Sequence, residues 1–241
     1  MSSIAGTALS WAFKAVLLLV LYFVFRIGRL LIKGYRYTSA NFMSASVKDD
    51  PRYQERKLLD KALELPVARL YGPNTIWQPR EGYCGAASLA NVMRSVNPAH
   101  KVQFGPFPRP YVVQRLAELL TGLLQEEAVQ FKRVEVLPLM QLDEFRQVMR
   151  RVNDPAYRFI ANFYRLPLFF AKAPWYVRLR KVFSGHFSPV VAYLPDEDLV
   201  AILDVNQSYG TYLVPTERFW EAVQSKDVSS GKYRALIQVA L

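Results

Sequence analysis

The sequence predicts an α+β fold preceded by an apolar N-terminal helix. Segments with the apolar spacing of helices fill the first half of the folded region, and segments with the alternation of strands fill the second half. The strands follow one another without intervening helices, which favours an antiparallel sheet over repeated βαβ units. Residues 4–25 form an almost uncharged apolar run before this region.

The N-terminal run contains 22 residues with a single charge, a length that can cross a bilayer as a helix. Four basic residues follow it, namely Arg26, Arg29, Lys33 and Arg36. Basic flanks favour the cytoplasmic side of a membrane. We therefore expect residues 1–37 to be a single-pass membrane anchor that contacts lipid, with the folded domain in the cytoplasm. A periplasmic domain and a partly inserted amphipathic helix are the alternatives.

Residues 38–56 are polar and rich in Ser, Asp and Arg, which indicates a linker, and the folded domain is expected over residues 57–241. The domain should begin with a short helix that ends at Pro66. Three further helices are predicted: one starting at or just before Cys84, one over residues 110–127, and one starting at Leu142.

Strands are predicted after the helices. Residues 157–165 alternate aromatic and aliphatic side chains, and residues 189–195 and 199–205 form two strands joined by a turn with three acidic residues. A last strand over residues 235–241 closes the chain.

Composition restricts the possible chemistry. The single cysteine excludes an intrachain disulfide and a cysteine-rich metal cluster, and with only two histidines we expect neither a protein metal site nor a tightly bound cofactor. The formal charge of +11 could serve nucleic acid, a membrane surface or acidic substrates. No nucleic-acid motif accompanies the charge, so we predict no nucleic-acid partner.

Cys84 is the candidate nucleophile. It lies where the loop WQPREGY gives way to a helix, and the positive end of the helix dipole favours a thiolate. A base is needed beside it. His100 lies in a polar stretch after the helix, whereas His186 lies at the start of a strand with Gly185 clearing space beside it. We therefore predict that His186 is the general base and acid for Cys84.

Asp204 is the candidate for the residue that orients this histidine. It ends the strand predicted over residues 199–205, and a hairpin would place it at the same sheet edge as His186. Asp196 and Asp198 lie in the turn at the far end of that hairpin. The order of cysteine, histidine and acid is that of papain-like enzymes, although such triads are defined by geometry.

Gln78 lies six residues before Cys84. A side-chain amide there can pair with the backbone N–H of the nucleophile and stabilise a developing oxyanion. A surface glutamine without this role is the alternative.

Three segments resemble the signatures of phytochelatin synthases: QPREGYCGAAS from Gln78, GHFSP from Gly185, and ILDV from Ile202. The resemblance runs from about residue 60 to the C-terminus and is to the short bacterial members that consist of the catalytic domain alone. It implies a papain-like fold, a triad of Cys84, His186 and Asp204, and Gln78 as the oxyanion residue. It also implies transfer or hydrolysis of the γ-glutamylcysteinyl group of glutathione, with release of glycine.

The same resemblance implies a set of substrate-binding residues, namely Asn162, Arg165, Gly185, Phe187 and Asp227. Asn162 and Arg165 resemble the residues that hold the γ-glutamyl end, and Asp227 resembles an acid that faces its amino group. A glutamyl group carries both charges, so its site needs a partner of each sign. A surface ion pair is the alternative for Arg165 and Asp227.

Two segments depart from the family pattern. Gln207 stands where the family has an arginine, and we therefore expect hydrolysis to be favoured over phytochelatin synthesis. Cadmium or zinc is expected only as a thiolate complex of the substrate. Residues 166–184 are longer than the family's loop and mix aromatic with cationic side chains, which favours an interfacial membrane contact, with an ordinary solvated loop as the alternative.

Two other functions are compatible with the same sequence features. The same triad could belong to a membrane-associated papain-like hydrolase or acyltransferase with a different substrate. A non-enzymatic membrane protein that binds thiols or metals is a further alternative. A homodimer is left open as the oligomeric state.

Overall fold

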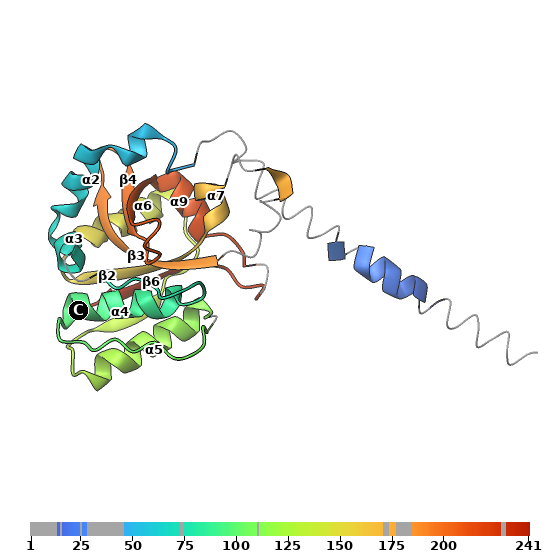
Figure 1. The fold of residues 1–241 in the computed structure, drawn as a ribbon, viewed down its shortest axis with the longest axis horizontal. Coiled ribbons are helices and arrows are strands. Elements are labelled where there is room, and N and C mark those ends of the chain that lie inside the picture. The colour runs from blue at the N-terminus through green and yellow to red at the C-terminus, as the bar shows by residue number, and fades with distance from the viewer. Residues whose placement is uncertain are drawn as a thin grey trace, which may run out of the picture. The chain divides into compact units, whose positions relative to one another are not determined.

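The computed structural model describes residues 14, 16–24, 26–27, 46–72, 75–109, 111–170, 174–176, 185–227 and 230–241. The chain divides into two compact units, Met1–Met43 and Ser44–Leu241. The second unit contains the elements that Figure 1 labels and all the predicted site residues.

The described residues do not support the predicted membrane anchor. Residues 14, 16–24 and 26–27 are helical, whereas residues 4–13, 15 and 25 of the predicted span lie outside the described part. A spanning helix needs about 20 apolar residues. Among the residues that were placed, no helix is both long enough and apolar enough to cross a bilayer. The prediction of a transmembrane helix and of a single-pass membrane location is therefore corrected.

The second unit begins earlier than expected. Residues 46–54, within the predicted linker, pack on the folded domain: the Val47 side chain is buried, and its N–H donates to the Leu168 carbonyl at 2.9 Å. A 3₁₀ helix, η1 (Pro51–Gln54), follows. The remaining helical elements are α2 (Arg56–Leu63), α3 (Pro66–Tyr71), α4 (Cys84–Val96), α5 (Val113–Glu126), α6 (Leu142–Arg150), η3 (Arg151–Asn153), α7 (Arg165–Phe169) and α9 (Thr216–Val223).

The strands form one sheet in the order β1-β6-β2-β3-β4-β5, and every pairing is antiparallel. Their bounds are β1 (Arg133–Val136), β2 (Tyr157–Tyr164), β3 (Gly185–Leu194), β4 (Leu199–Leu203), β5 (Thr211–Pro215) and β6 (Leu236–Ala240). The central strands β2, β3, β4 and β6 are almost fully buried because helices cover both faces of the sheet.

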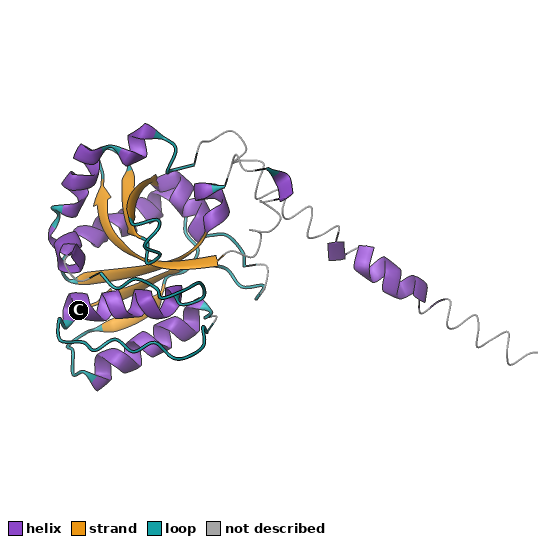
Figure 2. Ribbon diagram, in the orientation of Figure 1, coloured by secondary structure: helices purple, strands orange, loops and turns teal. Residues whose placement is uncertain are grey.

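The two faces of the sheet carry separate hydrophobic cores. Along β2, Ile160 joins the core built with α2 to α5, whereas Phe159 and Ala161 join the core built with α6, α7 and α9. This is the alternation that a strand requires when both of its faces are covered. Figures 1 and 2 show the resulting layers, with α4 and α5 on one side of the strands and α6, α7 and α9 on the other. The α+β class is confirmed.

The local predictions are confirmed in part. The helix starting at Cys84 and the strands over the predicted ranges are present. Pro66 does not end a helix but is the first residue of α3, where its missing N–H has no intrahelical partner to lose. The short strands β1 and β5 and the helices α7 and α9 were not predicted.

Candidate active site

Cys84 is the first residue of α4, and its side chain is partly buried. The first backbone hydrogen bond of this helix runs from the Ala87 N–H to the Tyr83 carbonyl. The N–H groups before Ala87 therefore point out of the helix end at which the thiol lies. Their partial positive charge favours a thiolate and offers donors to a developing oxyanion.

Two sets of hydrogen bonds hold the loop before Cys84. Asn91 on α4 donates to the Ile76 carbonyl at 2.8 Å and accepts from the Ile76 N–H at 2.9 Å. The Gln78 N–H donates to the Val205 carbonyl at 2.8 Å. These bonds place Gln78 between the nucleophile's helix and the residue after Asp204. Its side-chain Oε1 is buried and has no hydrogen-bond partner among the described residues.

Two glycines allow the loop that precedes α5 to cover the start of α4. Gly82 has φ +89°, and a Cβ there would lie 2.7 Å from Pro108 Cβ. A Cβ on Gly85 would lie 2.7 Å from Tyr111 Cδ2. Both distances are too short for non-bonded carbon atoms, so glycine is needed at these positions for Pro108 and Tyr111 to pack this closely on the start of α4.

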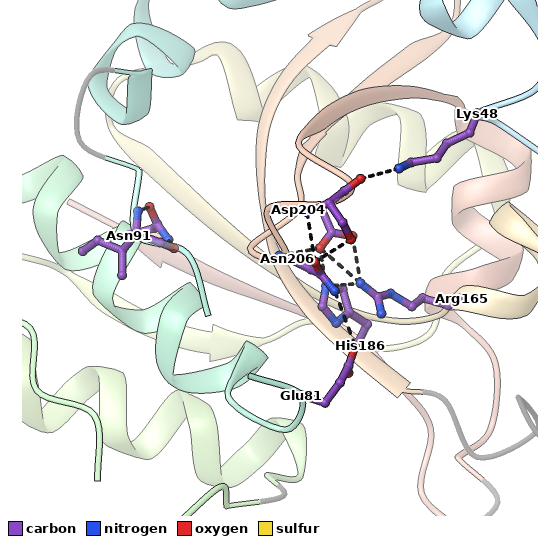
Figure 3. Close-up of polar contacts among 9 residues, drawn as sticks. Lys48, Glu81, Asn91, Arg165, His186, Asp204 and Asn206 are labelled. Atoms are coloured by element: carbon purple, nitrogen blue, oxygen red, sulfur yellow. Dashed lines mark hydrogen bonds and ion pairs between the residues drawn. The ribbon is translucent and has the colours of Figure 1, made fainter. Parts of the chain in front are cut away.

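His186 and Asp204 meet at one edge of the β3–β4 hairpin. His186 is the second residue of β3, Asp204 directly follows β4, and the two strands are antiparallel. His186 Nε2 lies 2.8 Å from Asp204 Oδ1, and both side chains are buried (Figure 3). Because Nε2 donates to this carboxylate, Nδ1 is the ring nitrogen left to face the thiol. The ring of Phe163, on β2, packs edge-on against the imidazole.

Arg165 completes this buried group of charges. Its Nη2 lies 3.2 Å from Asp204 Oδ1 and 3.3 Å from Oδ2, and 3.2 Å from His186 Nε2. The Asn206 N–H also donates to Asp204 Oδ1, at 2.9 Å. Burial raises the pKa of the Asp204 carboxyl, but the charge and hydrogen bond of His186, the charge of Arg165 and the Asn206 N–H outweigh it and hold the pKa below its usual value. Asp204 therefore remains a carboxylate.

The contacts between Cys84 and His186 favour a thiolate–imidazolium pair. Burial raises the pKa of the Cys84 thiol, but the hydrogen bond and charge of His186, the main chain of Phe187 and the charge of Arg165 together lower it. Burial lowers the pKa of His186, but the charge and hydrogen bond of Asp204 and the contact with Cys84 raise it. A lowered thiol pKa and a raised imidazole pKa are the shifts that an activated cysteine nucleophile requires.

A cleft of about 230 Å³ opens beside Cys84. One wall comes from the start of α4 with the loop before it and from the segment that leads into α5, and the other comes from β2, β3 and the segment before β6. The lining residues are Gly82, Cys84, Gly85, Arg109, Tyr111, Val112, Val113, Gln114, Asn162, Gly185, Phe187, Asp227, Ser230, Lys232, Tyr233 and Arg234. Three cations and one carboxylate are among them, so the cleft is basic overall.

An ion pair lies in the second wall. Arg234 Nη2 donates to Asp227 Oδ1 at 3.0 Å, and the N–H and hydroxyl of Ser230 donate to Asp227 Oδ2 at 3.0 and 2.8 Å. The Asp227 side chain keeps 27% of its surface exposed. A Cβ on Gly185 would lie 3.2 Å from Arg234 Nη2, so the space that this glycine clears is occupied by the guanidinium.

The structure brings most of the predicted residues together. Cys84, His186 and Asp204 form one connected group, and Asn162, Gly185, Phe187 and Asp227 line the cleft beside it. Arg165 is placed elsewhere: it contacts Asp204 and His186 and is not among the residues that line the cleft.

Two residues at the candidate site were not predicted from the sequence. Arg234 lies seven residues after Asp227, and this separation across a turn gave no local signal of a pair. Tyr209 packs its ring over the Arg165 guanidinium, with the Arg165 Cζ 4.5 Å from the ring centroid. It lies in the run that departs from the family pattern, and that departure was the only available signal.

The insertion predicted to contact a membrane is described in part. Leu166, Leu168 and Phe169 are buried in the domain, whereas Trp175 is 71% exposed. Residues 171–173 and 177–184, with the predicted cations, lie outside the described part. Phe169 packs its ring against Tyr209 and Tyr212, so the start of this insertion belongs to the core.

Among the described residues, no group of three or more His, Cys, Asp and Glu side chains could hold a metal ion. The other histidine, His100, pairs its Nδ1 with Glu127, and the Asn97 side-chain amide donates to the same carboxylate. His100 is therefore held in a pair with Glu127 at the end of α5, and it does not line the cleft.

Comparisons with known proteins identify the family of the chain. The chain matches curated proteins named glutathione gamma-glutamylcysteinyltransferase 1 and 2 of Arabidopsis thaliana, with 26% and 25% identity over 68% of this chain. The matches cover 35% and 37% of those relatives, so the chain spans about a third of their length. A protein named glutathione gamma-glutamylcysteinyltransferase 1 of Lotus japonicus is 33% identical over 63 residues, which are 26% of this chain and 13% of that relative. The family model described as phytochelatin synthase matches residues 54–236, and the chain therefore belongs to the phytochelatin synthase family.

Proposed function

We propose that this chain is a cysteine-dependent γ-glutamylcysteinyl transferase that acts on glutathione through an acyl-enzyme at Cys84 and favours hydrolysis over phytochelatin synthesis. The observation that carries the proposal is the Cys84–His186–Asp204 group at the edge of a small basic cleft. The relatives' names supply the substrate class.

The cleft fits a short acidic peptide. Glutathione carries two carboxylates and one ammonium, and the cleft offers Arg109, Lys232 and Arg234 against the single carboxylate of Asp227. Its volume of about 230 Å³ favours a small ligand, because pockets for drug-sized ligands measure roughly 300–1,000 Å³. The α-ammonium of the glutamyl group would pair with Asp227 and its α-carboxylate with Arg234, because the two charges already lie side by side.

The first half-reaction forms a thioester. The Cys84 thiolate attacks the carbonyl carbon of the cysteinyl–glycine bond, and the oxygen of the tetrahedral intermediate takes the negative charge. The free N–H groups at the start of α4 and the Gln78 side-chain amide are the proposed donors to that oxygen. The His186 imidazolium then gives its proton to the glycine nitrogen, the C–N bond breaks, and glycine leaves. Asp204 holds the imidazole in the required tautomer throughout.

The second half-reaction consumes the thioester. Neutral His186 takes a proton from water, the hydroxyl attacks the thioester carbon, and γ-glutamylcysteine leaves as the Cys84 thiolate returns. Transfer to the amine of a second glutathione would instead extend the peptide. The sequence supports hydrolysis, because Gln207 is an exposed amide where the family has an arginine that could hold a second anionic substrate.

We propose that cadmium or zinc enters only as a thiolate complex of glutathione. The substrate thiol is the soft ligand in such a complex. The described residues offer a single thiol, Cys84, and the mechanism needs that thiol as the nucleophile.

The test is product analysis after mixing the protein with glutathione, with and without Cd²⁺. We expect release of glycine and γ-glutamylcysteine, an acyl adduct on Cys84 by mass spectrometry, and neither with Cys84→Ala. The second histidine of the chain offers a matched control, since His186→Ala should abolish glycine release and His100→Ala should not. An intact, unmodified Cys84 without free glycine overturns the proposal, and a dominant extended peptide overturns the preference for hydrolysis.

A further inference from the structure

The ring of Tyr209 lies in contact with two cations. Arg165 Cζ lies 4.5 Å from the ring centroid, and Lys48 Nζ lies 4.1 Å from it. Distances below about 6 Å give a favourable interaction between a cation and the electron-rich face of an aromatic ring. Arg165 is buried, so its interaction with the ring occurs away from water and is stronger than a surface contact.

The same loop provides the ring and the carboxylate that contact Arg165. The Asp204 N–H donates to the Gly210 carbonyl at 3.2 Å, and the N–H groups of Tyr209 and Gly210 donate to the Asn206 carbonyl. The loop is therefore a closed turn. It presents Asp204 to the guanidinium at 3.2 Å and Tyr209 to the same guanidinium, so displacement of the ring releases one of the two contacts.

Lys48 attaches the start of the domain to this turn. Its Nζ donates to the Ser208 carbonyl at 2.7 Å (Figure 3), in addition to its contact with the Tyr209 ring. The neighbouring Val47 is buried and bonded through its N–H to Leu168 of α7, the helix that begins with Arg165. The segment 46–48 thus connects α7 with the turn on which Tyr209 and Asp204 lie.

We propose that Tyr209 is a positioning residue for acyl transfer at Cys84, which holds Arg165 against Asp204, and that Lys48 holds Tyr209 in place. The aromatic ring carries this role, and the hydroxyl does not. The proposal rests on the proposed acyl-transfer chemistry of Cys84, but it does not depend on glutathione being the substrate.

The experiment measures alkylation of Cys84 by iodoacetamide as a function of pH, together with kcat and KM for glycine release. Arg165 lies on the path from Tyr209 to the triad, and its charge contributes to the lowered pKa of the thiol. We expect Tyr209→Leu to slow alkylation near neutral pH about tenfold and to move the midpoint of the profile to higher pH. Kcat should fall to a similar degree while KM is retained. Tyr209→Phe keeps the ring and should retain the wild-type rate and midpoint. Lys48→Met should slow alkylation and raise the midpoint by a smaller factor than Tyr209→Leu does.

A cation–π pair at the opposite end of β2 provides the matched control. Arg151 lies 5.6 Å from the ring of Tyr157, and Tyr157→Leu should leave the alkylation profile unchanged. Wild-type profiles in Tyr209→Leu and Lys48→Met would overturn the proposal. Loss of activity in Tyr209→Phe would overturn it as well, because that variant keeps the ring. If Tyr209→Leu does not fold, the Lys48→Met and Tyr209→Phe profiles decide. Because alkylation needs no glutathione, a failure of the substrate assignment is distinguishable from a failure of this inference.

Discussion

Replacing Asp204 with asparagine removes one charge and keeps the shape of the side chain. In the described part of the chain, His186 Nε2, Arg165 Nη2 and the Asn206 N–H lie within 3.3 Å of the carboxylate oxygens and donate to them. An asparagine oxygen can replace one carboxylate oxygen, but its NH₂ group must then face a donor. In the variant, His186 therefore donates to an uncharged acceptor, and Arg165 stays buried without a carboxylate partner.

The size of each effect follows from these contacts. A hydrogen bond to a charged group contributes about 1.5–3 kcal/mol, and each 1.4 kcal/mol is a factor of ten, so the thiolate–imidazolium pair should be about 10- to 100-fold less populated. Alkylation of Cys84 near neutral pH should slow by the same factor. Removing one partner of a buried ion pair costs about 3–5 kcal/mol of folding free energy, and both side chains of this pair are at least nine-tenths buried. We expect a fall in Tm of roughly 6–12 °C for about 3 kcal/mol.

Acid titration provides a second measurement on the same variant. Because the pKa of Asp204 is lowered by folding, its contribution to stability is complete above the unfolded value of about 3.9 and is lost as pH falls through the folded value. Wild-type protein should therefore lose this contribution below about pH 4. Asp204→Asn should show a smaller loss of unfolding free energy over the same range.

Two variants separate the charge from the fold. Asp196→Asn, in the exposed turn at the other end of the hairpin, should change neither alkylation nor Tm. Arg165→Met in the Asp204→Asn background should recover part of the lost stability, because it removes the unpaired cation, but it should not restore alkylation. A single Asp204→Asn variant with wild-type alkylation and wild-type Tm would refute the assignment of Asp204.

Three further predictions concern the neighbours of the triad. Asp227→Asn should raise KM for glutathione about 10- to 100-fold with kcat largely retained, since it weakens one charged contact; an unchanged KM contradicts its substrate role. Gln78→Ala should lower kcat about 10²- to 10³-fold at constant KM if the amide donates to the oxyanion, and steady-state kinetics measure this. Gly82→Ala should destabilise the domain in urea by about 1–3 kcal/mol, because φ is +89° and the new Cβ lies 2.7 Å from Pro108 Cβ. Unchanged unfolding would contradict that strain.

The fold was predictable where local pattern is strong. The central strands are buried on both faces and rich in aliphatic and aromatic residues, so their composition reveals them. Strand β1 is only partly buried and pairs with β6, about a hundred residues later in the chain. No local pattern encodes such a pairing. Pro215 ends β5 and directly precedes α9, and a proline there resembles a loop when the sequence alone is considered.

The meeting of Cys84, His186 and Asp204 was predictable because few residues could fill such a group. One cysteine and two histidines leave little choice, and the hairpin that joins His186 to Asp204 is short. The membrane anchor was inferred from length and hydropathy alone, and the described helical residues do not reach the required length. The start of the domain was also placed too late, because the polar composition of residues 46–54 conceals the burial of Val47.

The ion pairs Arg165–Asp204 and Arg234–Asp227 look alike in the sequence but differ in burial. Arg165–Asp204 has side chains that are 8% and 0% exposed, so neither partner can leave the other for a substrate charge. In the Arg234–Asp227 pair the arginine side chain is only 2% exposed, but the Asp227 side chain is 27% exposed, and both residues line the cleft. Under the proposed function, the ammonium of a glutamyl group would reach Asp227 at little desolvation cost, whereas the Arg165–Asp204 pair sets the electrostatics around His186. The sequence shows the four charged residues, but only the packing around each pair shows which pair faces the cleft.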